Sequence, residues 1–307
     1  MAARIETPFV SRSPTSLDIT GHTKLVTLIG KPAFHSKSPE THTLAWRKVG
    51  IDAIFLSFEI DLDGLDAAMQ GFRNIDGWIG LTVTMPLKQA IVKHMDRLND
   101  IARLSNAVNI VRKEEDGSLS GFNSDGPGFM NNLAKSGFVA PNSRMVLLGP
   151  GGAGRAIMVQ AALDGVAEID VFARKGGTSF KEASKVAEAL MQESDCKIRM
   201  FPFEDKDQMK RSIDSADVLV NASNVGMGVG NTELPIDPAL IKQGMFVADV
   251  VNTPRKTQLL KDAEARGCVV VDGLGMLDQQ AVVADLIRFG IEIPIEEVRA
   301  ELDASSG

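Results

Sequence analysis

The sequence contains no tyrosine, although 14 phenylalanines and 2 tryptophans occur among its 307 residues. Cysteine is almost as rare. Cys196 and Cys268 stand far apart, without the spacing of a disulfide framework or a zinc site, so we expect two reduced thiols. The four histidines show no zinc-ligand spacing either, and we expect no bound metal. A chain of this length can build a sufficient hydrophobic core without such cross-links.

Long apolar runs are also missing. No stretch of eighteen apolar residues occurs, and the first twenty residues contain no apolar segment typical of a secretory signal. We therefore expect no membrane partner and a cytoplasmic location. Basic residues are in the minority, with a net charge of −7 and a pI near 5.2, which argues against a nucleic-acid partner.

The chain does contain a regular alternation of short β-rich runs with helical patterns, typical of a parallel α/β architecture over about two domains. In the first half the pattern predicts helices at 40–49, 62–72 and 87–97, and strands at 24–29, 53–59, 78–83, 107–112 and 119–122. In the second half it predicts the six strands of a doubly wound nucleotide-binding sheet, at 145–148, 169–173, 197–201, 218–221, 246–250 and 269–271. We expect a last helix at 278–289 to fold back on the first domain, and 1–20 and 303–307 to be loose ends.

A glycine-rich loop follows the predicted strand at 145–148. Its sequence from Gly149 to Gly154 matches G-x-G-x-x-G, and an apolar-periodic helix continues to Leu163. In this strand–turn–helix context, bare backbone and a helix N-terminus can accept a pyrophosphate, so the loop indicates a dinucleotide site. The alternative is a tight turn that binds no ligand.

The end of the next predicted strand bears on the choice of cofactor. NAD enzymes usually place an acid there, but this chain has Arg174 and Lys175, with no acid before Glu182. Two adjacent cations suit the 2′-phosphate of NADP, and Arg155 could add a third. We therefore favour NADP over NAD. If the two cations are only a solvated strand end, either cofactor fits.

Ser36 and Ser38 flank one residue in a predicted loop before a helix. Two hydroxyls so placed can bind one carboxylate, which the helix N-terminus would also favour. Equally, Ser38 followed by Pro39 is an ordinary helix N-cap with proline at the next position. The spacing favours neither interpretation.

Lys88 follows Pro86, which we expect to open the helix at 87–97. In the first turn of that helix the dipole disfavours the ammonium form, so Lys88 is a candidate general base; the alternative is a solvent-facing lysine. Asp125 precedes another predicted helix. It is either a cap or, if it faces Lys88 across a cleft, a partner at the same substrate hydroxyl. In that case the opposite charge would stabilise the ammonium and oppose the dipole effect.

Taken together, the motifs of this chain resemble those of the shikimate/quinate dehydrogenase family, from about residue 25 to 293. In the first half they are H-S-x-S-P at 35–39, V-T-x-P-x-K at 83–88, A-V-N at 107–109 and G-x-N-S-D-x-x-G at 121–128. In the second half they are G-x-G-G-A at 149–153, N-A-S-N-V-G-M at 221–227, Asp249…Pro254 with Thr257, and G-L-G-M-L at 273–277 followed by Gln280. So many motifs in one order argue against an accidental similarity.

The resemblance implies two α/β domains with the active site in the cleft between them. These would be a substrate-binding domain at 1–124 plus 277–307 and a Rossmann-like, doubly wound NAD(P)-binding domain at 125–276. It implies a reversible hydride transfer between NADP or NAD and a ring hydroxyl of shikimate, quinate or a close analogue, as in the shikimate pathway of aromatic amino acid biosynthesis. The substrate would be a small ring carboxylate, and the protein a monomer or homodimer.

The resemblance also assigns roles to single residues. Lys88 becomes the general acid/base and Asp125 its catalytic partner. The substrate carboxylate is assigned to Ser36 and Ser38, and the ring hydroxyls to Thr84, Asn109 and Gln280. The cofactor is assigned to Gly149, Gly151, Gly152 and Ala153 at the pyrophosphate, to Arg174 and Lys175 at the adenosine ribose or its phosphate, and to Asn221, Ser223, Val225 and Met276 along its length, with Met276 near the nicotinamide.

The chain departs from the family pattern at several positions. Thr82 stands where the family usually has Asn, Asn106 where it has Gly, and Ile110 where it has Thr. Asn252 stands where the family usually has a tyrosine, so the lack of tyrosine in this chain coincides with one position of the family pattern. After Gln280, residues 281–285 replace small and aromatic residues. Because these positions border the family's substrate and nicotinamide pockets, the ring substituents that this chain recognises stay open.

Two other functions also stay open at the level of the sequence. One is a family paralogue that acts on a different polyol or hydroxy acid, and the other is a dinucleotide-binding sensor without turnover. The presence of both Lys88 and Asp125 counts against the sensor.

Overall fold

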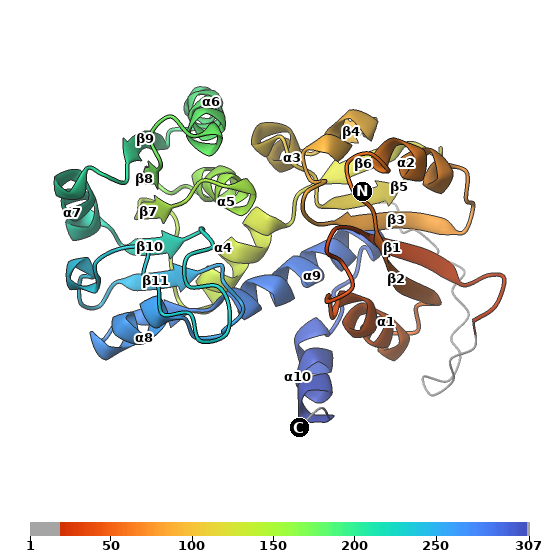
Figure 1. Cartoon of the computed structure of the whole chain (residues 1–307). Coiled ribbons are helices and arrows are strands. Elements are labelled where there is room, and N and C mark those ends of the chain that lie inside the picture. The colour runs from red at the N-terminus through yellow and green to blue at the C-terminus, as the bar shows by residue number, and fades with distance from the viewer. Residues whose placement is uncertain (1–18, 306–307) are drawn as a thin grey trace. The chain divides into compact units, whose positions relative to one another are not determined.

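The computed structural model describes residues 19–305, which form two compact units (Figure 1). Unit 1 consists of the chain up to Leu98, the segment Val108–Phe122 and the chain from Ala281 onward. Unit 2 consists of Asn99–Ala107 and Asn123–Gln280. Each unit has its own six-stranded sheet with helices around it, so the predicted α/β fold class is confirmed.

The sheet of unit 1 has the strand order β2-β1-β3-β5-β6-β4. The strands are β1 (Lys24–Gly30), β2 (Ala53–Glu59), β3 (Trp78–Val83), β4 (Arg97–Leu98), β5 (Ile110–Lys113) and β6 (Leu119–Phe122). β1 is parallel to both β2 and β3, whereas β5 is antiparallel to β3 and to β6. The carboxyl ends of β1 and β3 therefore share one edge of the sheet with the amino end of β5.

One face of this sheet is covered by three helices: α1 (Ser38–Lys48), the later part of α9 (Gly273–Phe289) and α10 (Ile295–Ser305). Trp46 of α1 is fully buried, with its ring 5.8 Å from Phe55 and 5.2 Å from Phe289 between centroids. Ile295 and Val298 of α10 belong to the same core cluster. The C-terminal residues are thus part of the core of unit 1, and the predicted helix at 278–289 does fold onto it.

The other face carries α2 (Leu65–Arg73), whose buried residues Leu65 and Met69 lie four apart on one side of the helix. Phe72 stacks on Trp78 of β3 at 5.2 Å between ring centroids. The indole N–H of Trp78 donates to Thr27 Oγ1 at 3.1 Å, which satisfies a polar group inside this layer.

The segment after β3 forms the 3₁₀ helix η1 (Ala90–His94), so the α-helix predicted at 87–97 is wrong. The cause is a long-range hydrogen bond, because the Lys88 carbonyl accepts from the Val108 N–H at 2.8 Å and is taken out of the helical pattern. The Val92 N–H then donates to the carbonyl of Gln89, three residues back, at 3.2 Å.

Three further elements were not predicted: β4, α3 (Asp100–Ser105) and α10. Since α10 extends to Ser305, the expectation of a loose end from 303 is wrong over 303–305. α9 also begins at Gly273, five residues earlier than the predicted start at 278.

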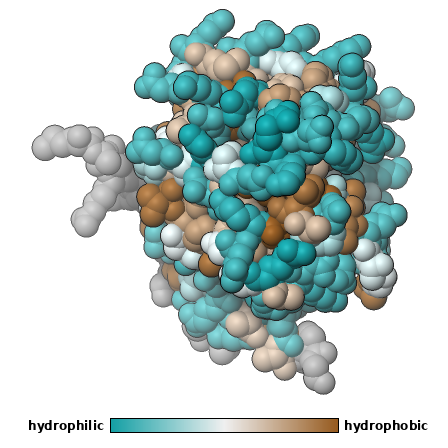
Figure 2. Space-filling model, turned by 90° about the vertical axis from the view of Figure 1, so that its left-hand side faces the viewer, coloured by the Kyte–Doolittle hydropathy of each residue, from teal (hydrophilic) through white to brown (hydrophobic). Residues whose placement is uncertain are grey.

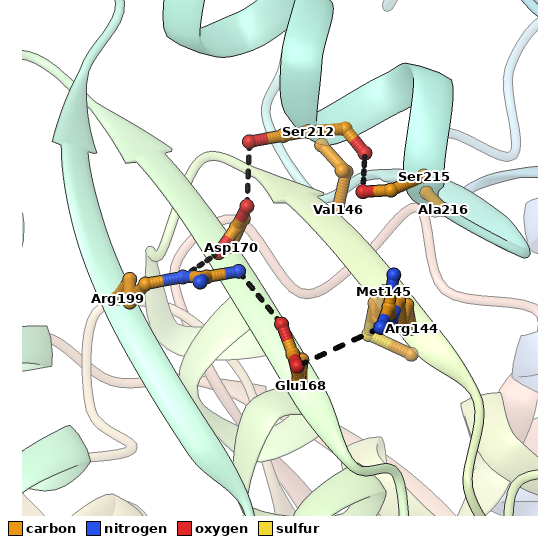
Figure 3. A pocket seen from close by; sticks show the side chains of 9 residues that line it. All are labelled: Arg144, Met145, Val146, Glu168, Asp170, Arg199, Ser212, Ser215 and Ala216. Carbon is orange, nitrogen blue, oxygen red and sulfur yellow. Dashed lines mark hydrogen bonds and ion pairs between the residues drawn. The ribbon is translucent and has the colours of Figure 1, made fainter.

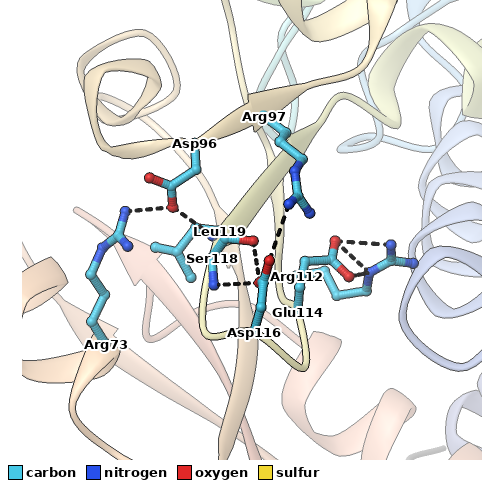
Figure 4. A network of polar contacts seen from close by, with 8 residues as sticks. All are labelled: Arg73, Asp96, Arg97, Arg112, Glu114, Asp116, Ser118 and Leu119. Atoms are coloured by element: carbon cyan, nitrogen blue, oxygen red, sulfur yellow. Dashed lines mark hydrogen bonds and ion pairs between the residues drawn. The ribbon is translucent and has the colours of Figure 1, made fainter.

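The turn between β5 and β6 is held by a polar network (Figure 4). Asp96 accepts from the Leu119 N–H at 2.7 Å and from Arg73 Nη2 at 3.0 Å, which ties the start of β6 to the end of α2. Asp116 accepts from the hydroxyl of Ser118 at 2.5 Å and from its N–H at 2.9 Å. These hydrogen bonds, together with Arg97, lower the pKa of Asp116 to about 2.

The sheet of unit 2 is parallel throughout, in the order β12-β11-β10-β7-β8-β9. All six predicted strands are confirmed, as β7 (Arg144–Leu148), β8 (Glu168–Ala173), β9 (Lys197–Pro202), β10 (Val218–Asn221), β11 (Phe246–Asp249) and β12 (Val269–Val271). The chain runs outward from β7 to β9 and then returns beside β7 with β10. Doubly wound sheets bind ligands at the carboxyl ends of the two strands that flank such a reversal.

Helices cover both faces of this sheet: α4 (Asp125–Lys135), α5 (Gly152–Leu163), α6 (Thr178–Glu193), α7 (Lys206–Ser215), η2 (Pro238–Leu240) and α8 (Gln258–Ala265). Met145 and Leu147 of β7 belong to the core cluster that includes residues of α4 to α6. Val146 and Leu148 belong to the cluster that includes residues of α7 and α8. Burial on both faces explains why β7 is a continuous apolar run.

A small polar cavity lies at the amino ends of β7 and β8 (Figure 3). Asp170 accepts from Arg199 Nε at 2.7 Å and from Ser212 Oγ at 2.5 Å, and Glu168 pairs with Arg199 at 2.8 Å. These bonds cross-link β8, β9 and α7. The cavity is therefore lined by groups that bind one another, at the opposite end of β7 from the glycine loop.

None of the helices within residues 19–305 is long and apolar enough to cross a membrane. On the face shown in Figure 2, hydrophobic residues lie in small groups between hydrophilic ones. Cys196 and Cys268 are both buried and unpaired, as expected, and burial raises the pKa of Cys196 to about 11. Over the same residues, no group of three or more His, Cys, Asp or Glu side chains is placed to hold a metal.

Candidate functional site

Two loops of unit 1 meet at the carboxyl edge of β1 and β3. The Thr84 N–H donates to the Ile29 carbonyl and the Lys31 N–H to the Met85 carbonyl, both at 2.9 Å. Gly30 makes this approach possible, because a Cβ there would lie 2.3 Å from Thr84 Cγ2. The loop that carries the two predicted serines therefore starts beside the loop that carries Thr84 and Lys88.

Ser36 and Ser38 lie at the start of α1, and both are half-buried. The N-cap of α1 is Lys37, without a side-chain capping bond, so the interpretation of Ser38 as the cap is wrong. Ser36 Oγ instead accepts from the Ser38 N–H at 3.2 Å. Ser38 stands as the first residue of an eleven-residue helix, where the helix dipole favours an anion.

Thr84, Lys88 and Asn109 lie on neighbouring main-chain segments. The Asn109 carbonyl accepts from the Val83 N–H at 2.8 Å, and the Lys88 carbonyl accepts from Val108, the residue before Asn109. Lys88 is half-buried and comes before η1, not within an α-helix. The helix-dipole argument for Lys88 as a base is therefore wrong, and its candidacy depends on its place at the sheet edge.

In unit 2 the glycine loop joins β7 to α5, with Gly151 as N-cap and no side chain capping the helix. Two of its glycines are required by packing, since a Cβ at Gly149 would lie 2.8 Å from Ser223 and one at Gly154 would lie 2.4 Å from the Gly149 carbonyl. Gly151 and Gly152 have no atom within 4 Å of such a Cβ. Packing therefore does not account for these two glycines, which leave bare backbone at the helix N-terminus, a type of site that can accept a phosphate.

Arg174 and Lys175 follow β8 directly and are both exposed. Within residues 19–305 neither pairs with a carboxylate, so both are open to an anionic ligand. Arg155 is not a third such cation. Its side chain is buried and pairs with Glu182 at 2.8 Å, and burial lowers the pKa of its guanidinium. Arg155 supports the glycine loop from beneath, where Nη1 donates to the Pro150 carbonyl at 3.5 Å.

Asn221 ends β10 beside the glycine loop and is fully buried. Its Nδ2 donates to Asp249 Oδ1 at 3.0 Å and to the Val225 carbonyl at 3.2 Å, and its Oδ1 accepts from Ser223 Oγ at 2.6 Å. Asp249 also accepts from Thr257 Oγ1 at 2.7 Å, and burial raises the pKa of its carboxyl. Two separate sequence motifs thus form one network that fixes the loop carrying Ser223 and Val225.

Asp125 is the first residue of α4 and is buried, while Ser124 is the N-cap, so the interpretation of Asp125 as a cap is wrong. Its N–H donates to Asn123 Oδ1 at 2.9 Å. One turn along α4, a Cβ at Gly128 would lie 2.7 Å from the Gln280 nitrogen. Gly128 therefore lets α9 come close, and it places Gln280 beside the face of α4 that carries Asp125.

The structure thus gathers the predicted residues into one group in unit 1 and two groups in unit 2. Unit 1 brings together Ser36, Ser38, Thr84, Lys88 and Asn109 at one sheet edge. Unit 2 brings together the glycine loop, Asn221, Ser223 and Val225 at the reversal of the strand order, and Asp125 with Gln280 at α4. Met276 of α9 is buried in a core cluster of unit 2.

Comparison with known proteins identifies the family. The family model for the shikimate dehydrogenase substrate binding domain matches residues 28–111. A shikimate dehydrogenase (NADP(+)) of Listeria monocytogenes serotype 4b is 40% identical over 285 residues, which is 92% of this chain and 96% of the relative. The chain belongs to the shikimate dehydrogenase family. Members of this family are oxidoreductases that act on a CH–OH group.

Two solved structures share the fold of this chain. A crystal structure of shikimate 5-dehydrogenase from Listeria monocytogenes in complex with shikimate and NAD has a TM-score of 0.89 and 38% identity, and covers 94% of this chain and 99% of that one. The ligand-free 5-ketofructose reductase of Gluconobacter sp. strain CHM43 has a TM-score of 0.81 and 29% identity, with 93% and 99% covered.

Two departures from the family pattern have a local explanation. Asn106 is the C-cap of α3 in the left-handed conformation, with φ of 48°, which asparagine tolerates better than most residues other than glycine. Asn252, at the position of the family's tyrosine, is exposed, and its Oδ1 accepts from Thr253 Oγ1 at 3.1 Å.

Sequence reasoning gave no role to Asn123 or Arg288. The Asn123 side chain is fully buried and donates to the Ala107 carbonyl at 3.0 Å. Arg288 lies on α9 beyond the last family motif, and its contact with Thr82 spans 206 residues. Only the position of Asn123 inside the motif at 121–128 could have drawn attention to it.

Proposed function

We propose that this chain is a shikimate dehydrogenase that interconverts shikimate and 3-dehydroshikimate and uses NADP in preference to NAD. The observation that carries the proposal is the near full-length identity of 40% with a shikimate dehydrogenase (NADP(+)). It is supported by Lys88 and Asp125, which occupy the motif positions of the catalytic pair.

Each unit has a role in this proposal. Most of the proposed substrate residues lie in unit 1, in keeping with the substrate binding domain model that matches 28–111, and all of the proposed cofactor residues lie in unit 2. The domain boundaries that we propose are those of the sequence, with 1–124 plus 277–307 for the substrate and 125–276 for the cofactor.

The substrate is recognised at its carboxylate and at its ring hydroxyls. Ser36 and Ser38 donate hydrogen bonds to the carboxylate at the start of α1, where the helix dipole adds attraction. The ring hydroxyls are bound by Thr84, Asn109 and Gln280. Lys88 takes the proton of the reacting hydroxyl in oxidation and returns it in reduction, and Asp125 orients that hydroxyl.

The residues of unit 2 fit a dinucleotide. Gly149, Gly151, Gly152 and Ala153 offer backbone to the pyrophosphate at the amino end of α5. Arg174 and Lys175 bind the 2′-phosphate, which is why NADP is preferred. Asn221, Ser223, Val225 and Met276 line the rest of the cofactor. When bound, the nicotinamide accepts or supplies the hydride.

The test is an assay of nicotinamide absorbance with shikimate, quinate and a panel of polyols, each with NADP and NAD. We expect the highest kcat/KM for shikimate with NADP. Measurable cofactor binding without turnover of any ring carboxylate would contradict the proposal. Turnover confined to a polyol would indicate the paralogue with a different substrate.

A further inference from the structure

Unit 1 contains a buried charged cluster outside the residues assigned above. Asp285 and Arg288 of α9 have fully buried side chains and pair at 3.2 Å between Oδ1 and Nη1. Asp285 Oδ2 accepts from Trp46 Nε1 at 2.8 Å and hydrogen-bonds His42 Nδ1 at 2.8 Å. Burial lowers the pKa of the Arg288 guanidinium, and Asp285 opposes that shift. A buried pair of this kind contributes little net stability over apolar side chains, so its presence asks for another explanation.

Arg288 connects this cluster to the edge of the sheet where the substrate residues lie. Its Nη2 donates to Thr82 Oγ1 at 2.6 Å, and its guanidinium lies 5.7 Å from the centroid of the Phe55 ring. Thr82 is half-buried, sits near the carboxyl end of β3 and precedes Thr84 by two residues. The buried cluster thus ends at a side chain that is partly open, next to a proposed substrate residue.

The contact with Arg288 fixes the role of the Thr82 hydroxyl oxygen. A guanidinium can only donate, so Thr82 Oγ1 is the acceptor and its own hydrogen is left for another partner. The cross-strand neighbours of Thr82 are Ile110 and Leu28, whose side chains cannot accept that hydrogen. Thr82 and Ile110 are both positions at which the chain departs from the family pattern. At Thr82, the hydrogen bond comes from Arg288 of α9.

Two other polar atoms close to Thr82 and its cross-strand neighbours have spare hydrogen-bonding capacity. Within residues 19–305, Arg288 Nε and Ser57 Oγ are buried without a hydrogen-bond partner. Ser57 is aligned with Leu28, which is aligned with Thr82, so Ser57 and Thr82 point to the same side of the sheet. Buried polar atoms without partners are rare, and here they accompany a hydroxyl that accepts from Arg288 and keeps its own hydrogen to donate.

We propose that the Arg288–Asp285 pair is a positioning device that holds the Thr82 hydroxyl as a hydrogen-bond donor to a ring oxygen of the substrate. Thr82 is thereby a residue that determines which ring acid the chain accepts, and Arg288 and Asp285 act through it. This inference rests on the proposed function, because it needs a ring substrate at the edge formed by β1, β3 and β5.

The first test compares Thr82→Val, which removes the hydroxyl and keeps the shape, with Thr82→Ser, which keeps the hydroxyl. We expect Thr82→Val to raise KM for shikimate about tenfold, which corresponds to about 1.4 kcal/mol and to one lost hydrogen bond. We expect kcat and the KM for NADP to change less than about twofold in Thr82→Val. In Thr82→Ser the KM for shikimate should stay close to that of the unmodified chain.

Thr27→Val is the matched control. Thr27 lies on the adjacent strand β1 but on the opposite face, where its hydroxyl accepts from Trp78. The control loses a buried hydrogen bond and is expected to lower the melting temperature while leaving KM for shikimate unchanged. An equal rise of KM in both variants, or an unchanged KM in Thr82→Val, would overturn the inference.

The second test asks whether the buried pair acts through Thr82. The double variant Asp285→Asn/Arg288→Met removes both charges without leaving one unpaired. We expect it to raise KM about as much as Thr82→Val, and to add nothing further when combined with Thr82→Val. Additive effects on KM would show that the pair acts elsewhere and would refute the positioning role. If the double variant does not fold, the Thr82 variants alone decide.

The failure of this inference can be told from the failure of the proposed function. If the unmodified chain turns over no ring carboxylate, the proposed function fails before any variant is made. If it turns over shikimate and the Thr82 variants have unchanged KM, only the inference fails.

Discussion

The main chain around Lys88 is held in place both before and after its side chain. Leu87 before it is fully buried, and the Lys88 carbonyl is bound by the Val108 N–H at 2.8 Å. A substitution at position 88 therefore removes the ammonium group without releasing the loop. This makes Lys88 a clean target for testing the proton transfer that we assign to it.

We expect Lys88→Ala to lower kcat by about 10²- to 10⁴-fold, the usual contribution of a general acid or base. Affinity for NADP should stay nearly intact, because the cofactor residues lie in unit 2. The measurements are steady-state kinetics with shikimate and a binding titration with NADP. Lys93→Ala is the matched control, since Lys93 lies in η1 of the same segment and, among residues 19–305, pairs only with exposed Asp66 at 2.7 Å. A Lys88→Ala variant with unmodified kcat would remove Lys88 from the catalytic role.

Arg174 offers a second test at the scale of one residue. Loss of a charged hydrogen bond to a phosphate costs about 1.5–3 kcal/mol, so Arg174→Ala should weaken NADP binding by roughly ten- to a hundredfold. NAD has no 2′-phosphate, and its binding should change by less than about threefold. Fluorescence titration with both cofactors measures this. Arg144→Ala, at the opposite end of β7, should affect neither cofactor. Equal losses for NADP and NAD in Arg174→Ala would show that Arg174 does not read the phosphate.

At the scale of single residues, sequence spacing could place the motifs but not the contacts. Arg155 is one residue beyond the glycine motif and has the charge for a phosphate contact, yet it folds beneath the loop onto Glu182. Ser38 stands before proline as a typical cap would, yet Lys37 is the cap. In both cases the outcome depends on the direction of a side chain, which spacing does not determine.

At the scale of elements, α10 shows how much the last residues contribute. Ile295 and Val298 are three apart on one side of this helix, and both are almost fully buried in the core that also contains Trp46. Exposed ion pairs accompany this packing, such as Lys48 with Glu301 at 2.5 Å, but pairs of this kind contribute little. The apolar side of α10 is therefore what holds it on unit 1.

Ile295→Ala should destabilise the chain by about 2–5 kcal/mol, because it leaves a cavity in a packed core. The measurement is urea unfolding followed by circular dichroism. Leu286→Ala is the control, since Leu286 lies on α9 but is 46% exposed, and it should change the free energy of unfolding by less than about 0.5 kcal/mol. Similar losses in the two variants would contradict the packing of α10 described above.

The elements that were predicted and those that were missed differ in where their stabilising contacts come from. β7 is apolar on both faces, so Met145 to Leu148 stand out in the sequence as a strand. η1 could not be predicted from local sequence, because it depends on a distant contact. The Val108 N–H, twenty residues further along the chain, donates a hydrogen bond to the Lys88 carbonyl. α10 is only eleven residues long, and Ile295, Val298 and Leu302 form a narrow apolar stripe among polar residues, which is a weak signal in the sequence.

At the scale of the whole molecule, carboxyl groups set the response to acid. In the part of the chain that the structure describes, hydrogen bonds lower the pKa of five of them below the ordinary value: Asp61, Asp66, Asp96, Asp116 and Glu193. Burial raises the pKa of Asp164 and Asp249. A carboxyl with a lowered pKa stabilises the fold above its unfolded pKa, and this contribution is lost as the pH falls through its folded pKa. The two raised groups act in the opposite sense.

Because the lowered groups are more numerous, we expect the melting temperature to fall as the pH is lowered from about 5 to about 2. Asp116→Asn should reduce this fall between about pH 4 and pH 2, since the pKa of Asp116 moves from 3.8 to about 2 on folding. Thermal unfolding at several pH values measures both effects. Asp63→Asn, an exposed acid before α2, is the control. A melting temperature that rises steadily with acid would contradict the prediction.

The candidate site was predictable as a set of motifs because each motif is short and local. The glycine loop, the two serines and Lys88 can each be read within ten residues. The contact between Arg288 and Thr82 joins positions 206 residues apart, and neither has a motif that points to the other. Such a contact depends on which helix returns to which sheet, and this is a property of the whole chain.

Unit 1 is built from pieces at both ends of the chain, and this has a consequence for synthesis. Unit 2 is nearly contiguous over Asn123–Gln280, so all of its strands have been synthesised before Ala281 is added. The first strands of unit 1 must wait for that whole segment, on the order of ten seconds at ordinary rates of translation. During this interval Trp46 and Phe55 lack the cover of Phe289 and Ile295. The nascent chain therefore exposes a hydrophobic surface in its N-terminal part, where a chaperone would be expected to bind first.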